Sequence, residues 1–297
     1  MRPFIIICIL LFSSISYADI QKKVFEYQNF NREYYIYTPT HFKKGILFLL
    51  HGGGGKKKGK DLGRFTKMNS VAEKYGFYVV YPNSLESQWN DGRNVSENGA
   101  DDIGFLNNLA TKLSKKLNVH PKNIFVAGIS NGGMMSARLA CESDTFYGFA
   151  MVASNLPIQQ MKTCKSIVNK PLIVINGTVD PIMPWKGGKI KKSKKRGAGG
   201  VVLSSEKTFQ FFAKKNSCSQ YFETNTLPDT NKKDSSIAQR RVYTSCKKTT
   251  VAYIIKGGGH CWPGSKAGFF YDHFAGPTNK DFSASEEIWK IFAENLM

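Results

Sequence analysis

The segment from Gly128 to Gly132, with the sequence GISNG, places a serine where it could act as a nucleophile. It follows the apolar run of residues 124–127 and precedes a helix-like stretch that begins at Met134. This is the strand-turn-helix context of a GxSxG nucleophile elbow, whose turn is so tight that the positions two residues either side of the serine must lack bulk. The pattern predicts that Ser130 is a catalytic nucleophile.

A serine hydroxyl is a poor nucleophile at neutral pH, so Ser130 needs a general base and a third group that orients the base. In α/β-hydrolases these residues follow in the chain order Ser, Asp or Glu, His. Asp180 lies in the loop after the apolar run of residues 172–175, where a buried strand would end. We expect Asp180 to be the orienting acid, although it precedes Pro181 and could instead be a simple turn residue.

His260 is the candidate general base. It follows three glycines directly after the last strand-like run, residues 250–255, so a flexible turn would present its imidazole at the end of that strand. His273 is the only other histidine late enough in the chain for this role. The spacing predicts a triad of Ser130, Asp180 and His260.

Acyl transfer passes through an oxyanion that needs N–H donors fixed in place before the reaction. The backbone N–H of Asn131 is the first candidate, because it follows the nucleophile at the start of a helix. The second is the N–H of Gly53 or Gly54 in the HGGGG segment of residues 51–55, after the apolar run Ile46 to Leu50. A flexible linker or a phosphate-binding loop is the alternative, but the GKS or GKT ending of the latter is absent.

Three tryptophans follow predicted strands or candidate catalytic residues. They are Trp89 in the segment WNDGR, Trp185 after the candidate acid and Trp262 after the candidate base. Side chains on loops at one sheet edge would form an apolar wall for an acyl or aromatic group. Ordinary packing beneath the loops is the alternative interpretation.

Short apolar runs alternate with segments of helical period along the chain. Strands are expected at residues 33–37, 46–50, 77–81, 124–127, 149–153, 172–175 and 250–255, and helices at 65–74, 103–117, 134–142, 206–215 and from Ser283, with Glu286 completing a capping box. This alternation predicts an α/β fold, with a mostly parallel central sheet covered by helices on both faces, in a single domain. Residues 186–200 and 219–240 are polar and are expected to be surface loops.

Residues 1–18 have the features of a signal peptide: Arg2, an apolar run and a small-residue cleavage site ending at Ala18. A membrane anchor is the alternative, but the apolar run is shorter than the ~20 residues a bilayer requires. Residues 19–297 would then form the catalytic domain of a secreted protein, extracellular or periplasmic.

Removal of residues 1–18 takes away Cys8 and leaves five cysteines in an oxidising compartment: Cys141, Cys164, Cys218, Cys246 and Cys261. Four of them allow three pairings, which the sequence does not resolve, and we expect Cys261 to stay unpaired. No CxxC spacing occurs and the histidines are scattered, so no metal site is expected.

The chain of 297 residues carries a formal charge of +20, which becomes +19 when Arg2 leaves. Basic residues are concentrated at residues 56–60 and 186–196, the latter with seven basic residues and no acid. Such runs could dock an anionic surface or polymer, but a solvated lysine-rich surface is the simpler interpretation. Neither run has the interleaved aromatic residues of nucleic-acid recognition, so no specific nucleic-acid partner is expected.

Five motifs together resemble secreted esterases of the polyhydroxybutyrate depolymerase and feruloyl esterase type. They are HGGGG at residue 51, WNDGR at 89, GISNGGMMSARLACE at 128–142, NGTVDPIMPWKGG at 176–188 and GGGHCWPG at 257–264. The resemblance covers almost all of the exported chain. It implies an α/β-hydrolase fold, the triad named above, no cofactor, and hydrolysis of carboxylic esters outside the cytoplasm. It also implies disulfides between Cys141 and Cys164 and between Cys218 and Cys246.

The sequence departs from this family pattern at Cys261, where a small or hydroxyl residue is usual, and at Lys186 with the basic run after it. No separate polymer-binding domain is evident. These departures favour short hydroxybutyrate-type oligoesters or related small esters as substrates over crystalline polyester. A feruloyl or acetyl esterase acting on plant polysaccharide is the alternative, and a non-catalytic cationic binding protein is the alternative from another class. The sequence does not determine the oligomeric state.

Overall fold

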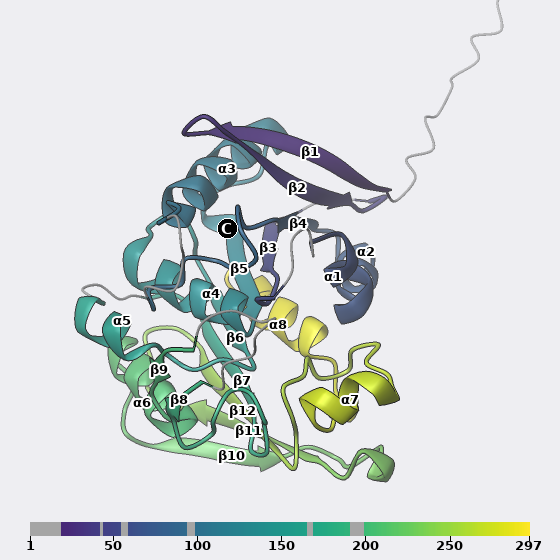
Figure 1. The fold of residues 1–297 in the computed structure, drawn as a ribbon, viewed down its shortest axis with the longest axis vertical. Coiled ribbons are helices and arrows are strands. Elements are labelled where there is room, and N and C mark those ends of the chain that lie inside the picture. Colours follow the sequence, from purple (N-terminus) through teal and green to yellow (C-terminus); the bar gives the residue numbers. More distant parts are fainter. Residues whose placement is uncertain (1–18, 42–43, 55–58, 94–98, 165–168, 191–198) are drawn as a thin grey trace, which may run out of the picture.

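A ten-stranded sheet forms the centre of the molecule (Figure 1). The computed structural model describes residues 19–41, 44–54, 59–93, 99–164, 169–190 and 199–297. The strands of the sheet are β1 (Asp19–Tyr27), β2 (Phe30–Thr38), β3 (Ile46–Leu50), β4 (Tyr78–Pro82), β5 (Ile124–Ile129), β6 (Phe149–Val152), β7 (Leu172–Gly177), β10 (Phe222–Thr226), β11 (Ile237–Tyr243) and β12 (Thr250–Lys256). A small second sheet pairs β8 (Gly188–Lys189) with β9 (Val201–Val202).

The strand order is β1-β2-β4-β3-β5-β6-β7-β12-β11-β10. Every pairing from β4 across to β12 is parallel, whereas β1, β2, β10 and β11 add antiparallel pairs at the two sides. The carboxyl ends of the six parallel strands therefore meet at one edge of the sheet. This architecture confirms the expected α/β fold with a mostly parallel sheet.

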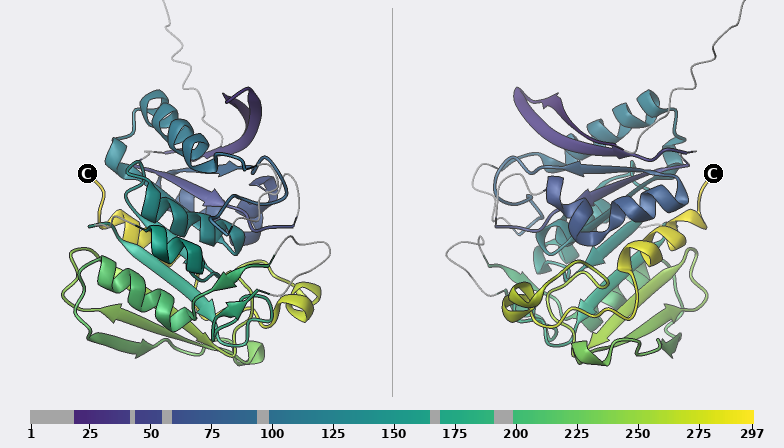
Figure 2. Two further views of the ribbon diagram at one scale, coloured as in Figure 1. Left: turned by 60° about the vertical axis from the view of Figure 1, so that its left-hand side comes forward. Right: turned by 90° about the vertical axis from the view of Figure 1, so that its right-hand side faces the viewer.

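Helices cover both faces of the sheet (Figure 2). They are α1 (Gly59–Thr66), α2 (Met68–Tyr75), α3 (Asp102–Leu117), α4 (Asn131–Glu142), α5 (Ile158–Thr163), α6 (Ser205–Lys215), α7 (Phe269–Ala275) and α8 (Ala284–Ala293), with 3-10 turns at Pro121–Asn123 and Lys232–Asp234. Apolar residues of α3, α4 and α6 pack on one face, and those of α1, α2 and α8 on the other. No helix in the described part of the chain is long and apolar enough to cross a membrane.

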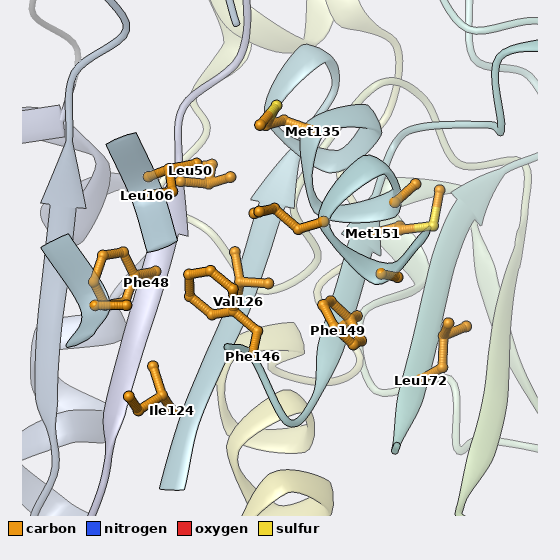
Figure 3. Close-up of a cluster of buried hydrophobic side chains, with 14 of the residues drawn as sticks. Phe48, Leu50, Leu106, Ile124, Val126, Met135, Phe146, Phe149, Met151 and Leu172 are labelled. Atoms are coloured by element: carbon orange, nitrogen blue, oxygen red, sulfur yellow. The ribbon is translucent and has the colours of Figure 1, made fainter. Parts of the chain in front are cut away.

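The period-two alternation of a strand divides the core into two layers. Phe48 and Val126 point into the layer beneath α3 and α4, which Figure 3 shows, whereas Leu49 and Phe125 point into the layer beneath α8. Strands buried on both faces have few polar residues. This is why β3 and β5 were recognisable as continuous apolar runs.

Two of the expected elements are wrong. The single helix expected at residues 65–74 is two helices, because Lys67 adopts a left-handed conformation with φ 59°. Thr66 produces the break: its hydroxyl accepts a hydrogen bond from the Met68 N–H, and its carbonyl accepts one from the Ser285 hydroxyl. The supposed loop at residues 219–240 contains β10 and the first part of β11. These strands lie at the side of the sheet, where an antiparallel strand does not need an apolar sequence.

The strand β1 was not predicted, whereas the helix cap at Ser283 is confirmed, since its hydroxyl accepts a hydrogen bond from the Glu286 N–H. Residues 1–18 and most of the two lysine runs lie outside the described residues. Disulfides join Cys141 to Cys164 and Cys218 to Cys246, as the resemblance implied.

A buried ion pair links the antiparallel side of the sheet to α3. Arg32 and Asp102, whose side chains are 3% and 1% exposed, are 2.6 Å apart, and the guanidinium lies 3.8 Å from the ring centre of Phe105. Arg32→Met leaves the Asp102 carboxylate buried without its cation, so we expect a loss of about 3–5 kcal/mol in the free energy of unfolding. Urea titration monitored by circular dichroism measures it.

The matched control is Lys22→Met, which removes the cation of a pair with Glu33 on the same hairpin, in which the Lys22 side chain is 49% exposed. Solvent screens such a pair, so no measurable change in stability is expected. Equal effects of the two substitutions would contradict the role given to the buried pair.

Candidate active site

Ser130 stands on a strained turn between β5 and α4. Its φ and ψ angles are 56° and −120°, a conformation rare for any residue other than glycine. A Cβ atom at Gly128 would lie 2.2 Å from the Gly132 carbonyl oxygen, and one at Gly132 would lie 2.4 Å from the Leu50 carbonyl oxygen. Both glycines are therefore required by close backbone contacts, and the turn presents the half-buried Ser130 at the carboxyl edge of the sheet.

The glycine segment after β3 lies against this turn. A Cβ at Gly52 would be 3.4 Å from the Ser130 Cβ, and one at Gly53 would be 3.5 Å from the Asn131 Cβ. The Gly54 N–H donates to the Ser87 carbonyl, with a donor–acceptor distance of 3.1 Å. The structure thus brings Gly53 beside Asn131 and commits the Gly54 amide to the neighbouring loop.

Asp180 and His260 are in direct contact. The Nδ1 atom of His260 lies 2.7 Å from Asp180 Oδ2, and the two side chains are 8% and 2% exposed. The other carboxylate oxygen, Oδ1, accepts the backbone N–H groups of Ile182 and Met183 at 2.8 and 2.7 Å. These bonds stabilise the negative charge and fix the orientation of the carboxylate. The contact holds the imidazole with Nδ1 toward Asp180, which leaves Nε2 to exchange protons.

The loops that carry Asp180 and His260 pack together because they follow β7 and β12, which are parallel neighbours. The Val179 N–H donates to the Gly258 carbonyl at 3.0 Å. A Cβ at Gly177 would lie 2.2 Å from the same carbonyl oxygen, so this close approach requires glycine. Asp180 and His260 are 80 residues apart in the sequence, and the sheet places them side by side.

Helix α7 binds the backbone of His260 through two hydrogen bonds. The His260 N–H donates to the Ala275 carbonyl at 2.5 Å, and the Tyr271 hydroxyl donates to the His260 carbonyl at 3.2 Å. The sequence did not indicate this contact, because α7 was not among the expected helices. Both backbone polar groups of His260, its N–H and its carbonyl, are therefore hydrogen-bonded to α7.

An apolar cluster joins the loop that carries Asp180 to helix α4, which follows Ser130. Met134 of α4 packs with Met183, Ile190 and Val202, and all four side chains are buried. Met183 also donates its N–H to Asp180, and the Met134 N–H donates to the Ser130 carbonyl. Residues on either side of this cluster therefore have fixed positions relative to one another.

A buried polar network, missed by the sequence analysis, lies behind Asn131. The side-chain oxygen of Asn131 accepts the Trp89 N–H at 2.7 Å. Its side-chain nitrogen donates to the Trp89 carbonyl at 3.0 Å and to Asp91 Oδ2 at 2.6 Å. Asp91 also pairs with Arg93, and their side chains are 0% and 3% exposed. No signal in the sequence singled out this network, because the residues on both sides of WNDGR are themselves mostly polar.

Two of the three tryptophans expected to form an apolar wall are completely buried. Trp89 and Trp262 have no exposed surface, and their indole N–H groups donate to the His51 carbonyl and the Ser285 hydroxyl. Trp185 is partly buried and meets the ring of Phe209 edge-on. Trp89 and Trp262 therefore fit the packing interpretation, whereas a substrate-binding role for the partly exposed Trp185 stays a prediction. Among the described residues, no group of three or more His, Cys, Asp and Glu side chains is placed to hold a metal ion.

No protein-family model matches this chain. It is similar to the putative esterase NocK of Nocardia uniformis, with 25% identity over 74% of this chain and 65% of that protein. It is also similar to feruloyl esterase B of Piromyces equi, with 29% identity over 64% of this chain and 34% of that protein. The chain therefore spans less than two thirds of the length of either relative.

Among solved structures, the acetyl xylan esterase of Aspergillus awamori superposes with a TM-score of 0.57 at 15% sequence identity, over 86% of this chain and 100% of that one. Similarity at this identity establishes the fold, and the chain has the α/β-hydrolase fold. The curated relatives are esterases, which confirms the resemblance at the level of esterases.

Cys261 follows the candidate base and is buried, with a free thiol that donates to the Gly276 carbonyl at 3.2 Å. Burial raises the pKa of this thiol to about 12. We expect the folded chain of residues 19–297 to react negligibly with iodoacetamide at pH 8, since only the thiolate is nucleophilic. In denaturant without reductant, one thiol per chain should be modified, as measured by mass spectrometry. Cys261→Ser should show none, and modification of the folded protein would contradict the prediction.

Proposed function

We propose that this protein is a serine carboxylic ester hydrolase that uses a triad of Ser130, His260 and Asp180. The single observation that carries the proposal is the 2.7 Å contact between His260 Nδ1 and Asp180, at the same sheet edge as a strained turn that presents Ser130. The esterase names of the curated relatives support the same class of reaction.

In this mechanism the Ser130 hydroxyl attacks the ester carbonyl carbon while His260 Nε2 accepts the hydroxyl proton. The resulting imidazolium is stabilised by Asp180, which stays ionised. Collapse of the tetrahedral intermediate expels the alcohol, and His260 returns the proton to it. Water then attacks the acyl group on Ser130, with His260 again as the base, and releases the acid.

The negative charge on the tetrahedral oxygen requires donors positioned in advance. The Asn131 N–H begins α4 and has no acceptor four residues earlier within the helix. Gly53 is adjacent to Asn131, as the 3.5 Å approach of its Cβ position indicates. We assign these two backbone amides to the oxyanion. Gly54, the other candidate, directs its N–H to Ser87 in this structure.

For the substrate, the relatives favour acetyl or feruloyl esters of plant polysaccharide. Acetylxylan and feruloyl esterases are among them, so this class becomes our first choice over short hydroxybutyrate-type oligoesters. Export with cleavage after Ala18 is part of the proposal, and the two disulfides are compatible with an oxidising compartment.

Loss of the nucleophile tests the reaction. The wild-type protein should hydrolyse 4-nitrophenyl acetate, and Ser130→Ala should lower kcat by about 10⁶-fold or to the detection limit. Asp180→Asn should cost about 10⁴-fold, because the amide favours the wrong imidazole tautomer. Asp229→Asn, an exposed aspartate in a loop, is the matched control and should retain full activity. Full activity in Ser130→Ala would refute the proposal.

A substrate panel tests the acyl group. We expect kcat/KM to be at least about tenfold higher on acetylated or feruloylated xylo-oligosaccharides than on hydroxybutyrate oligomers of equal ester concentration, a difference of ~1.4 kcal/mol in transition-state binding. Chromatography of released acids measures it, with Ser130→Ala as the blank. The reverse preference would restore the oligoester hypothesis. Retention on a polyanion without labelling of Ser130 by a fluorophosphonate would instead favour a cationic binding protein.

A further inference from the structure

Asp91 is a buried carboxylate for which the triad mechanism has no use. Its side chain is 0% exposed. Asp91 Oδ2 lies 2.7 Å from Arg93 Nη2 and accepts from the Asn131 amide at 2.6 Å, and Asp91 Oδ1 accepts from Arg93 Nε at 2.9 Å. A carboxylate so completely removed from water must be paired with a cation or hydrogen-bond donors. One of its donors is the side chain of Asn131, the residue whose backbone N–H is the candidate oxyanion donor.

Asn131 is unusual because its side chain is fully used. Its Nδ2 donates to both Asp91 and the Trp89 carbonyl, and its Oδ1 accepts the Trp89 N–H at 2.7 Å. Rotation of the amide by 180° would set its oxygen against the Asp91 carboxylate, which is repulsive. The carboxylate therefore fixes the amide orientation, and with it the side-chain torsion of a residue that is 3% exposed.

The backbone of Asn131 needs this support. As the first residue of α4, it has no preceding turn of helix to hold its N–H in place. The turn before it is strained at Ser130, with φ 56°. A side chain tied to both polar groups of Trp89 supplies the restraint that the missing helical hydrogen bond would otherwise give.

Arg93 connects the network to the segment that leads into β9. Its Nη1 donates to the Gly199 carbonyl at 2.5 Å, and Gly200 packs so closely that a Cβ there would be 2.9 Å from Arg93 Cδ. Gly199 and Gly200 lead into β9, whose Val202 belongs to the cluster with Met134. Asp91 thus lies between the nucleophile helix and the segment that packs on it.

We propose that Asp91 is a positioning residue for ester hydrolysis: it holds the Asn131 side chain, and so keeps the Asn131 N–H aimed at the transition-state oxyanion. This inference rests on the proposed function. Arg93 neutralises Asp91 and fixes its orientation. The expected signature is a loss in kcat with little change in KM, because a displaced oxyanion donor weakens the transition state and not the bound ester.

The experiment is a double-mutant cycle with Asp91→Asn and Asn131→Ala, measured as kcat and KM on 4-nitrophenyl acetate. Each single change should lower kcat about 10- to 100-fold with KM within about twofold, since small displacements of catalytic groups cost this much. The double variant should be no slower than the slower single variant, because both remove the same restraint. Additive losses, or an unchanged kcat in either variant, would overturn the proposal.

Asn123→Ala is the matched structural control. Asn123 is also a buried asparagine, and it precedes the opposite end of β5, where it bonds to Lys44 and Met297. It should lower the thermal midpoint while leaving kcat unchanged. If Asp91→Asn behaved in the same way, the positioning role would be wrong. Should Asp91→Asn fail to fold, Asn131→Ala alone decides, and wild-type kcat in that variant overturns the proposal.

Covalent labelling of Ser130 tests the role of Asp91 separately from the proposed esterase function. A fluorophosphonate should modify Ser130 in the wild-type protein, and more slowly in Asp91→Asn, because phosphonylation also develops charge in the oxyanion site. No labelling of the wild type would refute the proposed function. Labelling of both proteins at equal rates would refute only the role of Asp91.

Discussion

The close approach of three backbone segments at the turn of Ser130 is the constraint on which the rest of the candidate site depends. Where β5 ends, the chain reverses so sharply that Gly128 meets the carbonyl of Gly132, and Gly132 meets the end of β3 at Leu50 and His51. Any side chain at those glycines would push the segments apart. Because they touch, Ser130 and Asn131 lie against the glycine segment at Gly52 and Gly53.

The parallel sheet supplies the second level of order. Its carboxyl edge gathers the loops that follow β3, β4, β5, β7 and β12 (Figure 1). Buried polar groups hold some of these loops in place. The segment WNDGR is a clear case, since Asp102 accepts the Asn90 N–H at 2.8 Å and Arg138 donates to the Asn90 carbonyl at 2.8 Å. Arg32, from the antiparallel hairpin, neutralises Asp102 at a distance of 2.6 Å. Residues far from the chemistry thus determine where a loop of the site lies.

The sequence predicted the central strands well because burial on both faces leaves a run of apolar residues. It failed at residues 219–240, since a strand at the side of a sheet needs backbone partners and not apolar side chains. It failed also at Lys67, where the contact that breaks the helix comes from Ser285, more than 200 residues away. For the site, residues next to strand ends were recognisable from local motifs. The partnership of Asp91 with Asn131 was not, because nothing in local spacing joins positions 40 residues apart.

The outermost strands of the sheet suggest a role for the positive charge that does not involve a ligand. Among the described strands, β1 and β10 each pair on one side, which leaves the other row of backbone N–H and C=O groups open. An open row invites a strand from another molecule, and charge is one means by which proteins discourage such pairing. On β1 the exposed Lys22 and Lys23 stand on adjacent positions, and β10 is exposed along its whole length with the polar sequence FETNT. A formal net charge of +20, or +19 without residues 1–18, also makes neighbouring copies repel one another, which opposes pairing between the outer strands of two molecules.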